Sequence, residues 1–359
     1  MQSNEIDFRP VHFVIAGEDC SAMQCALRCA HLGHYPSFEI SSVNRTRISI
    51  VVSSFSQIHD FVFEYKELFD NSYWRIVNLT EKAPQIELHR PQYEGKRRDF
   101  VDIEWEFVVG RFSHPILQEK LSRWANGRRR LTLILCFDDA KNESYAEKLR
   151  RRLSSGVRVE TFNLNRVGDA ESDAELLEMA KYLHYFYQAS YELKHVPTEL
   201  PLAEVDKAWN EIADEKLRMS NLYNVMSIPV KMQILGHDRS DWAEFYALTA
   251  EEIELLTAIE HNRWCVERLL QGMRPCTDSE REAVEEDMRL RLADSEYAAA
   301  HPVSLKKRYK DERCAHYDLC ANSELGVDES GLPVSRYDRD LTAAIPLIVK
   351  TFHDHYDDK

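Results

Sequence analysis

The fold of the first half of the chain is decided by the stretch Val11-His12-Phe13-Val14-Ile15-Ala16-Gly17. A short apolar run that ends at a glycine is typical of a buried parallel strand. From Ser21 to His34, small apolar residues recur every three or four positions, which predicts a helix. A strand, a turn and a helix in this order form the first step of an α/β sheet.

The same alternation continues outward from this stretch to residue 165. Further strands are predicted at Ile48–Val52, Arg75–Leu79, Leu131–Phe137 and Val157–Phe162, with helices at Ile58–Phe69 and Asn142–Leu153. Strands that alternate with helices indicate a doubly wound parallel sheet with right-handed crossovers. We therefore predict an α/β fold class, in which a doubly wound Rossmann-like parallel sheet is followed by a mostly α-helical region.

The segment Glu81–Phe107 interrupts this pattern and is interpreted as an insertion. It ends in Asp102-Ile103-Glu104-Trp105-Glu106-Phe107, where acidic and large apolar residues alternate. Such alternation predicts a strand with one solvent-facing side. Trp105 and Phe107 are then expected to pack in the core rather than to form a platform for a ligand.

The first strand-to-helix turn is the place where a sheet of this kind holds a dinucleotide. The pattern Gly-x-Gly-x-x-Gly permits a close approach of the backbone to the pyrophosphate. Here the turn reads Gly17-Glu18-Asp19-Cys20-Ser21-Ala22, so Gly17 is the remaining candidate for a cofactor contact. Glu18 and Asp19 place negative charge beside the expected phosphates. The next strand ends in Val51-Val52-Ser53-Ser54 and lacks an acid for the ribose, so ordinary NAD binding is not expected.

Three runs in this half resemble a known family: His12–Gly17, Ala26–Tyr35 and Arg47–Val52. Together they resemble the TrkA-N (RCK-like) nucleotide-binding domain, especially the form that bacteria fuse to RyR domains. The resemblance covers residues 10 to 165 and implies a domain that dimerises and responds to nucleotides. This chain lacks the channel helices of that family and most of its glycines, so the resemblance extends neither to channel gating nor to NAD sensing.

Composition limits the function classes further. The net charge of −15 argues against a general nucleic-acid binder, because phosphate contact needs clustered Lys and Arg. The cluster Arg128-Arg129-Arg130 leads directly into an apolar run and is interpreted as the flank of a strand. No segment has the ~18 to 20 apolar residues of a membrane span, and Met1–Pro10 lacks the apolar core of a signal peptide. We expect a cytoplasmic location, no membrane span and no nucleic-acid partner.

The cysteines do not indicate a disulfide scaffold or a metal centre. The eight cysteines include no CxxC pair, and their density is low for a secreted disulfide-rich chain. Cys314, His316 and Cys320 lie close together in sequence, but their spacing matches no standard zinc pattern. We predict no metal site.

The second half of the chain contains an internal repeat. Ser220–Val230 aligns with Tyr337–Leu347, and in both copies Ile-Pro begins seven residues after an Asn or Asp. Upstream, Ala180–Tyr187 aligns with Thr257–Trp264 at the positions His-x-x-aromatic. The second copy carries an extra segment, chiefly within Thr277–Cys314. We predict three domains: 1–165 for the nucleotide-binding fold, 166–245 for the first repeat and 246–359 for the second.

Each copy can be interpreted in physical terms. Asn221 and Asp338 have side chains that can accept hydrogen bonds at a helix start, which predicts that each is an N-cap. Pro229 and Pro346 are expected to end or kink the helix that follows, because proline removes a donor and clashes one turn back.

The repeat carries a second resemblance, on His261–Gly272, His316–Cys320 and Tyr337–Pro346. These runs resemble the RyR domain, the repeat named after ryanodine receptors. The resemblance covers residues 252 to 355, and more weakly 176 to 235 as a first copy. It implies recognition of an adenine-nucleotide-like small molecule in a cleft between paired repeats, without catalysis. The motif usually continues Gly-Trp, whereas here Met273 follows the glycine, which puts the identity of the ligand in question.

The chemistry of these runs suggests how a ligand is held. His261 and Trp264 are three residues apart and therefore lie on one helix face. Arg263, Arg268 and Arg274 can bind phosphates in a bidentate manner, and tyrosines can stack on a base. The candidate ligand-binding residues are His261, Asn262, Arg263, Trp264, Arg268, Tyr317, Tyr337, Asp338 and Arg339 in the second copy, and His184, Tyr187 and Asn221 in the first.

Several of these residues also have a purely structural interpretation. Trp264 can instead pack into the core, Arg263 can pair with Glu267 on a solvent-facing surface, and the cluster Asp338-Arg339-Asp340 can serve as a helix cap and dipole partner.

The function predicted from these features is a cytosolic sensor. Its RyR repeats would bind a nucleotide-derived small molecule, and its first domain would form a homodimer or larger homo-oligomer. Family association places such proteins in bacterial signalling or antiphage defence. One alternative is a non-catalytic interaction scaffold. Another is an enzyme that uses NAD or ADP-ribose, although the sequence has none of the common hydrolase, P-loop, zincin or kinase motifs.

Overall fold

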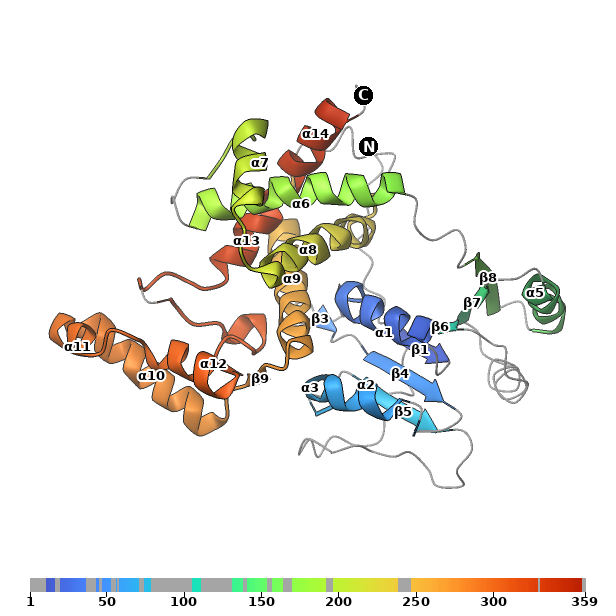
Figure 1. Ribbon diagram of the computed structural model, residues 1–359, viewed down its shortest axis with the longest axis horizontal. Helices are drawn as coiled ribbons and strands as arrows, with labels where there is room; N and C mark the ends of the chain where they lie inside the picture. Colours follow the sequence, from blue (N-terminus) through green and yellow to red (C-terminus); the bar gives the residue numbers. More distant parts are fainter. Residues whose placement is uncertain are drawn as a thin grey trace. The chain divides into compact units, whose positions relative to one another are not determined.

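Figure 1 shows the protein as a computed structural model, which contains two compact units. Unit 1 comprises residues 1–7 and 174–359, and unit 2 comprises residues 8–173. The structure describes residues 11–16, 20–36, 43–44, 47–52, 56, 58–70, 74–78, 105–110, 131–137, 141–153, 157–163, 170–191, 196–237, 247–328 and 330–356.

Unit 2 contains a six-stranded sheet in the order β5-β4-β1-β6-β7-β8. Every neighbouring pair in it is parallel. Its strands are β1 (Val11–Ala16), β4 (Arg47–Val52), β5 (Trp74–Asn78), β6 (Trp105–Gly110), β7 (Leu131–Phe137) and β8 (Val157–Asn163). The apolar runs therefore predicted five of these strands to within two residues, because such runs are buried between neighbours in a parallel sheet.

Short helices connect several of these strands. They are α1 (Cys20–Leu32), α2 (His59–Glu64), α3 (Lys66–Asp70) and α5 (Lys141–Arg152), and β2 (Tyr35–Pro36) pairs antiparallel with β3 (Val43–Asn44). On α1, Ala22, Ala26 and Ala30 are buried, as is Ile15 on β1. These alanines recur every four residues, so they form one face of the helix, and their small size permits close packing on the sheet.

The strand β6 corrects the interpretation of Glu81–Phe107 as an insertion that interrupts the sheet. β6 lies in the middle of the sheet, paired with β1 on one side and β7 on the other. A strand with two paired neighbours belongs to the core pattern of the sheet, and β6 continues beyond the predicted alternation into Val108-Val109-Gly110. The rest of the segment, up to residue 104, lies outside the described residues.

The predicted fold class is also corrected. Helices make up most of the residues that the structure describes, and its one larger sheet is confined to unit 2. A doubly wound sheet has helical crossovers throughout and helices on both faces. Among the described residues, helices occur only in the crossovers β1–β4, β4–β5 and β7–β8. The doubly wound Rossmann-like arrangement is therefore not observed, and the described chain is predominantly helical with one parallel sheet in unit 2.

Unit 1 is almost entirely helical. Its helices are α6 (Ala170–Tyr191, which begins just before the unit), α7 (Leu202–Asn210), α8 (Glu215–Ile234), α9 (Ala250–Leu270), α10 (Asp278–Ala293), α11 (Ser295–Ala300), α12 (Leu305–Arg313), α13 (Arg336–Ala343) and α14 (Ile345–Tyr356), with a 3-10 turn, η4, at Asn322–Glu324. A two-stranded parallel pair joins β9 (Arg274–Pro275) to β10 (Ala315–His316). Among the described residues, no helix is both long and apolar enough to cross a bilayer.

The central helix of unit 1 is α9, which packs against α8 and α13. It begins with a capping box, in which the hydroxyl of Thr249 accepts from the backbone N–H of Glu252 and the carboxylate of Glu252 accepts from the N–H of Thr249. This arrangement satisfies backbone donors that the helix itself leaves unpaired. The helix is thus fixed at its start, and its later turns carry the candidate site.

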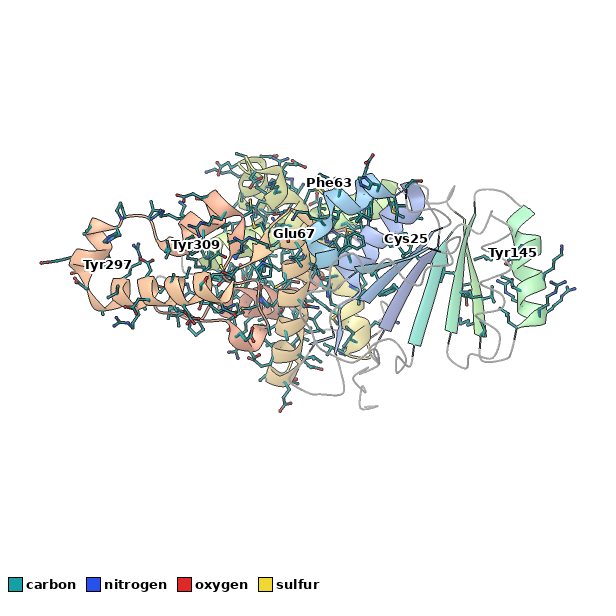
Figure 2. The ribbon with its side chains drawn as sticks, turned by 90° about the horizontal axis from the view of Figure 1, so that it is seen from below. Cys25, Phe63, Glu67, Tyr145, Tyr297 and Tyr309 are labelled. Atoms are coloured by element: carbon teal, nitrogen blue, oxygen red, sulfur yellow. The ribbon has the colours of Figure 1, made fainter. Side chains whose placement is uncertain are left out.

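The segment that is present only in the second copy forms α10, α11 and α12. Val284 and Met288 of α10 are buried with Tyr317, and Leu305 and Tyr309 of α12 pack against them. Figure 2 shows Tyr297 on α11 and Tyr309 on α12, in the same part of unit 1. The charge-rich helix α10 therefore has one apolar face buried against α12.

Two local predictions about the repeat are wrong. Asn221 lies inside α8, whose N-cap is Asp214, and Asp338 lies two residues after the start of α13. The Asn221 amide instead donates to the carbonyl oxygen of Leu217 one turn earlier, at 2.8 Å. The prediction for the prolines fails in the first copy only: Pro229 lies within α8, which continues to Ile234, whereas α13 ends at Ala343, just before Pro346 in the first turn of α14. Buried packing on both sides of a helix can outweigh the local cost of a proline.

Candidate ligand-binding site

The imidazole of His261 connects three segments of unit 1. On α9, its Nδ1 lies 3.0 Å from Oδ2 of Asp338 on α13, and its Nε2 lies 3.0 Å from the carbonyl oxygen of Cys320. A carbonyl oxygen only accepts hydrogen bonds, so Nε2 carries a proton. Both ring nitrogens are thus engaged within the protein, and His261 joins α9 to α13 rather than offering a free nitrogen to a ligand.

This pairing raises the pKa of His261. Burial alone would lower the pKa, but the hydrogen bonds of the ring, first among them the one to the Asp338 carboxylate, outweigh it. The side chain of His261 is 4% exposed, so solvent screens the pair little. We therefore describe His261 and Asp338 as an imidazolium–carboxylate pair.

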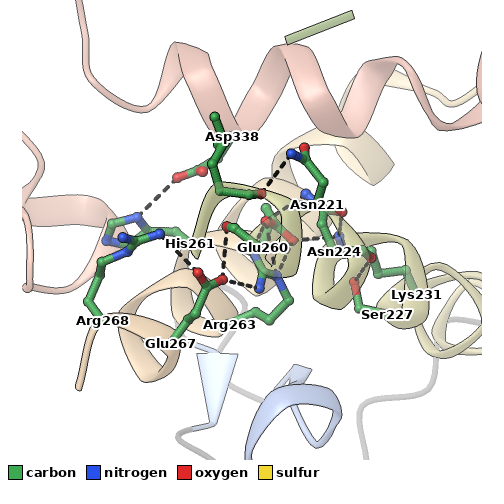
Figure 3. Close-up of polar contacts among 12 residues, drawn as sticks. Asn221, Asn224, Ser227, Lys231, Glu260, His261, Arg263, Glu267, Arg268 and Asp338 are labelled. Atoms are coloured by element: carbon green, nitrogen blue, oxygen red, sulfur yellow. Dashed lines mark hydrogen bonds and ion pairs between the residues drawn. The ribbon is translucent and has the colours of Figure 1, made fainter. Parts of the chain in front are cut away.

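A second set of charges lies beside this pair, in the interface of α8 and α9 (Figure 3). The guanidinium of Arg263 donates to Glu260 at 2.7 Å and to Glu267 at 2.8 Å. The other oxygen of Glu260 accepts from the ammonium of Lys231 on α8, also at 2.7 Å. Asn224 of α8 donates to Glu260 at 2.8 Å. We call Lys231, Glu260, Arg263 and Glu267 the buried ion network.

Burial decides the role of this network. The side chains of Lys231, Glu260 and Arg263 are each at most 2% exposed. Burial alone would raise the pKa of Glu260, but the charges of Arg263 and Lys231 lower it to about 2. Arg263 was predicted to contact the ligand or to pair with Glu267 on a solvent-facing surface. The pairing is confirmed, but it lies in the interior, where a guanidinium is stable only with its partners.

The first copy repeats the histidine contact in neutral form. His184 on α6 aligns with His261, and Asn221 on α8 aligns with Asp338. The amide nitrogen of Asn221 lies 3.4 Å from Nδ1 of His184. The ring of Trp209 meets His184 edge-on, with 6.1 Å between ring centroids. The aligned residues therefore meet in both copies, although each pair is far apart in sequence.

Trp264 is an aromatic candidate of intermediate burial, as are Tyr187 and Tyr337. It is partly exposed and stacks on His261, with 5.7 Å between ring centroids. The ring of His316 meets it edge-on at 5.0 Å, and the guanidinium of Arg268 lies 5.4 Å from its centroid. The indole is thus packed against two histidines, and the guanidinium lies over its ring. The arrangement combines an aromatic plane with a cation.

Sequence reasoning missed the polar residues beside His316, the residue of β10 that meets this indole edge-on. They are Asp318, which follows β10, and Lys306 of α12. Asp318 accepts from Lys306 at 2.8 Å, and its backbone N–H donates to Nδ1 of His316 at 3.3 Å. Burial lowers the pKa of His316 to about 4. Nothing local in the sequence shows that Lys306 pairs with Asp318, which lies 12 residues further along the chain.

The remaining candidates take different positions. Tyr317 is buried and donates to Glu285 at 3.1 Å, with Arg281 4.7 Å from its ring, so it is a core residue. Burial, together with Glu285, raises its pKa to about 12. Arg339 is more than half exposed and pairs with Glu254 at 3.3 Å. Arg274, also considered for phosphate contact, pairs with Glu280 at 2.7 Å.

Tyr337 and Tyr187 come together through a third tyrosine. Tyr187 stacks on Tyr191 of the same helix at 5.4 Å, and Tyr191 meets Tyr337 edge-on at 4.9 Å. Burial, opposed by Arg336 and supported by Asp328, raises the pKa of Tyr337 to about 12. Residues of the first and second copies are therefore neighbours here, as the predicted pairing of repeats requires.

Two candidates, Asn262 and Gly17, are not assigned to a contact. Asn262 is half-buried on α9 and makes interactions of its own. Gly17 lies outside the described residues. In the part of the chain that the structure describes, no group of three or more His, Cys, Asp or Glu side chains is arranged to hold a metal ion.

No family model, curated protein or solved structure matches this chain.

Proposed function

We propose that this protein binds a small nucleotide-derived molecule, such as an adenine nucleotide, an ADP-ribose-like compound or a cyclic nucleotide, at Trp264. The observation that carries the proposal is the arrangement around this indole: a partly exposed ring, fixed by His261 and His316 and adjacent to Arg268. Stacking on an aromatic ring suits a purine base, and a guanidinium suits its phosphates. The resemblance of His261–Gly272 to RyR repeats supports the same ligand class.

The pairing of His261 with Asp338 indicates how binding would have an effect beyond the site. Trp264 stacks on His261, and His261 holds α9 to α13. A ligand that changes the position of the indole therefore acts on the contact between two helices. A ligand works as a signal only when it favours one of two arrangements, and in this proposal the two arrangements differ at the α9–α13 contact.

The proposal is tested by melting the full chain with a panel of ATP, ADP, NAD, ADP-ribose, cyclic ADP-ribose isomers and cyclic di- and trinucleotides. A ligand at ~100 times its dissociation constant adds about 2.7 kcal/mol, which raises the melting temperature by a few degrees. Trp264→Leu is expected to abolish this shift.

The control is Trp209→Phe. Trp209 is also near a histidine and an arginine, but it is buried and belongs to the first copy. The shift should persist in this variant. A flat response to the whole panel, together with a stable complex with another protein, would favour an interaction scaffold instead.

A further inference from the structure

Two cysteines that are far apart in sequence lie together at the ring of His261. On α9, Cys265 is one helical turn after His261, and its Sγ lies 3.4 Å from Nε2 of that ring. The same Nε2 lies 3.0 Å from the carbonyl oxygen of Cys320, and this oxygen lies 3.8 Å from Sγ of Cys265. Residues 265 and 320 are 55 positions apart, so the fold, rather than the local sequence, brings them together.

The sulfur of Cys320 can turn toward that of Cys265. A carbonyl oxygen lies about 2.4 Å from its own Cα, so the Cys265 sulfur is at most about 6.2 Å from Cα of Cys320. The sulfur of Cys320 is only two bonds from that Cα. Cys320 belongs to residues 317–321, the segment between β10 and η4, which is neither helix nor strand. A side-chain rotation with a small shift of this segment can therefore bring the two sulfurs to bonding distance.

The two thiols differ in exposure and in neighbouring charge. Cys265 is only 6% exposed, whereas Cys320 is partly exposed. Burial alone would lower the pKa of Arg281 on α10, but a hydrogen bond to the Cys320 side chain raises it. Burial likewise opposes the raised pKa of His261, to which the Cys320 side chain contributes after Asp338 and Cys265. The more accessible thiol thus has two cationic side chains beside it, and oxidants attack such thiols first.

We propose that Cys320 and Cys265 form a modification site for hydrogen peroxide, which converts the two thiols into a disulfide between α9 and the segment before η4. Cys320 is the thiol that peroxide attacks, and Cys265 is the thiol that completes the disulfide. Peroxide is small enough to reach a partly exposed side chain, and the buried sulfur of Cys265 has to meet only Cys320. The assignment is independent of the ligand proposed at Trp264.

The oxidation takes two balanced steps. The sulfur of Cys320 attacks one oxygen of the peroxide: an S–O bond forms, the O–O bond breaks, and the released hydroxide leaves as water with the proton of the thiol. The sulfur of Cys265 then attacks the resulting sulfenic acid: an S–S bond forms, the S–O bond breaks, and hydroxide leaves as water with the Cys265 proton. Two thiols thus lose two electrons in total, and one peroxide becomes two waters.

The disulfide would lie directly beside the His261–Asp338 pair. Cys320 supplies the carbonyl oxygen that accepts from Nε2 of His261, so a shift of Cys320 toward Cys265 acts on the hydrogen bond that holds this ring. Cys265 stays on α9, which also carries His261. Oxidation therefore changes the contact between α9 and the segment before η4, and a thiol reductant reverses the change.

The test treats the full chain with hydrogen peroxide under native conditions. Free thiols are then blocked with iodoacetamide, and the digested protein is analysed by mass spectrometry. We expect linked peptides that contain Cys265 and Cys320, with a mass about 2 Da below the sum of the free peptides, because two hydrogens are lost. Dithiothreitol should separate them. Absence of this linked pair in the wild-type chain would overturn the proposal, and this measurement requires no variant to fold.

Two serine variants test which thiol reacts first. In Cys265→Ser, Cys320 has no partner, so its sulfenic acid should accumulate and react with dimedone. In Cys320→Ser, Cys265 should stay reduced, because it is buried. Dimedone labelling of Cys265 in Cys320→Ser, as fast as that of Cys320 in Cys265→Ser, would contradict the assignment of Cys320 as the thiol that peroxide attacks.

Cys314 provides the matched control. It is exposed, directly after α12, and only six positions from Cys320. Cys314→Ser should leave the linkage of Cys265 to Cys320 unchanged. In the chain unfolded by urea, a short loop closes more readily than a long one, so oxidation should instead link Cys314 to Cys320. The same Cys314–Cys320 linkage in the native chain would show that closeness in sequence, rather than the fold, pairs these cysteines, and would overturn the proposal.

Discussion

The two copies of the repeat place different chemistry at aligned positions. In the first copy Leu183 and Phe186 precede and follow His184 on α6, and both are buried. In the second copy Glu260 and Arg263 occupy the aligned positions around His261 and are just as buried. The same helix face is thus held by apolar packing in one copy and by the buried ion network in the other. Apolar packing tolerates small changes, whereas a buried charge depends on each of its partners.

The histidine contacts differ in the same sense. His184 faces the neutral amide of Asn221, and His261 faces the carboxylate of Asp338. The charged version lies next to Trp264, which is partly exposed, and the neutral version lies next to Trp209, which is buried. The comparison shows that the second copy has a buried charge pair, His261 and Asp338, next to the partly exposed Trp264. Such an arrangement is typical of functional sites rather than of cores.

The largest effect is expected from Arg263→Met. The substitution leaves Glu260 with Lys231 and Asn224, and it removes the shortest contact of Glu267, both in the interior. Breaking a buried charge pair costs about 3–5 kcal/mol. Equilibrium unfolding in urea measures this loss. At the aligned position of the first copy, Phe186→Leu should cost about 1 kcal/mol, because volume and polarity change little. Equal losses would contradict the distinction between the two copies.

The next effect concerns pH. A histidine whose pKa is raised by folding stabilises the protein fully below about pH 6.5, and this stabilisation is lost as the pH rises toward the pKa of the folded state. For His261 the free energy of unfolding should therefore fall above pH 7 by about 1.4 kcal/mol per pH unit. Asp338→Asn, which gives the second copy the neutral pair of the first, should remove this slope.

The reciprocal variant sharpens the same test. Asn221→Asp places a carboxylate opposite His184, so a new pH dependence should appear in the first copy. Proton uptake on folding, measured from pH 7 to 9, distinguishes the variants from the wild-type chain. A slope that persists in Asp338→Asn would show that the pH dependence does not arise from the His261–Asp338 pair.

Local patterns in the sequence predicted the contacts made within one element. The apolar run Leu131–Phe137 gave a strand with the same bounds in the structure. Helical spacing placed His261 beside Trp264 and Arg263 beside Glu267. These predictions succeed because residues three and four apart are neighbours on any helix.

Such local patterns did not predict the contacts between separate elements. Asp338 is 77 residues from His261, and Lys231 is 29 residues from Glu260. A buried arginine has the same local sequence as an exposed one, so the interior position of Arg263 could not be predicted. The packing of Leu305 and Tyr309 of α12 against Val284 and Met288 of α10 likewise involves residues that are remote in sequence.

A smaller effect is expected from Thr342 on α13. Its hydroxyl is buried and has no hydrogen-bond partner among the described residues. The aligned residue of the first copy is Val225, which is fully buried. Valine has nearly the same shape without the unpaired hydroxyl, so Thr342→Val should stabilise the protein by about 1 kcal/mol. A lower melting temperature in this variant would show that the hydroxyl has a partner in solution.

The smallest effect tests whether burial, rather than charge pairing itself, makes the second copy sensitive. Arg289 and Glu286 on α10 form a pair at 2.7 Å, as short as the contacts of Arg263, but both side chains are more than half exposed. Solvent screening makes such pairs contribute little, so Arg289→Gln should leave the free energy of unfolding nearly unchanged. The two substitutions remove an equally short contact from the same copy, and urea unfolding compares them directly. Equal losses of unfolding free energy in Arg289→Gln and Arg263→Met would show that the buried ion network does not owe its strength to its burial. The two copies would then differ only in how many charges each contains.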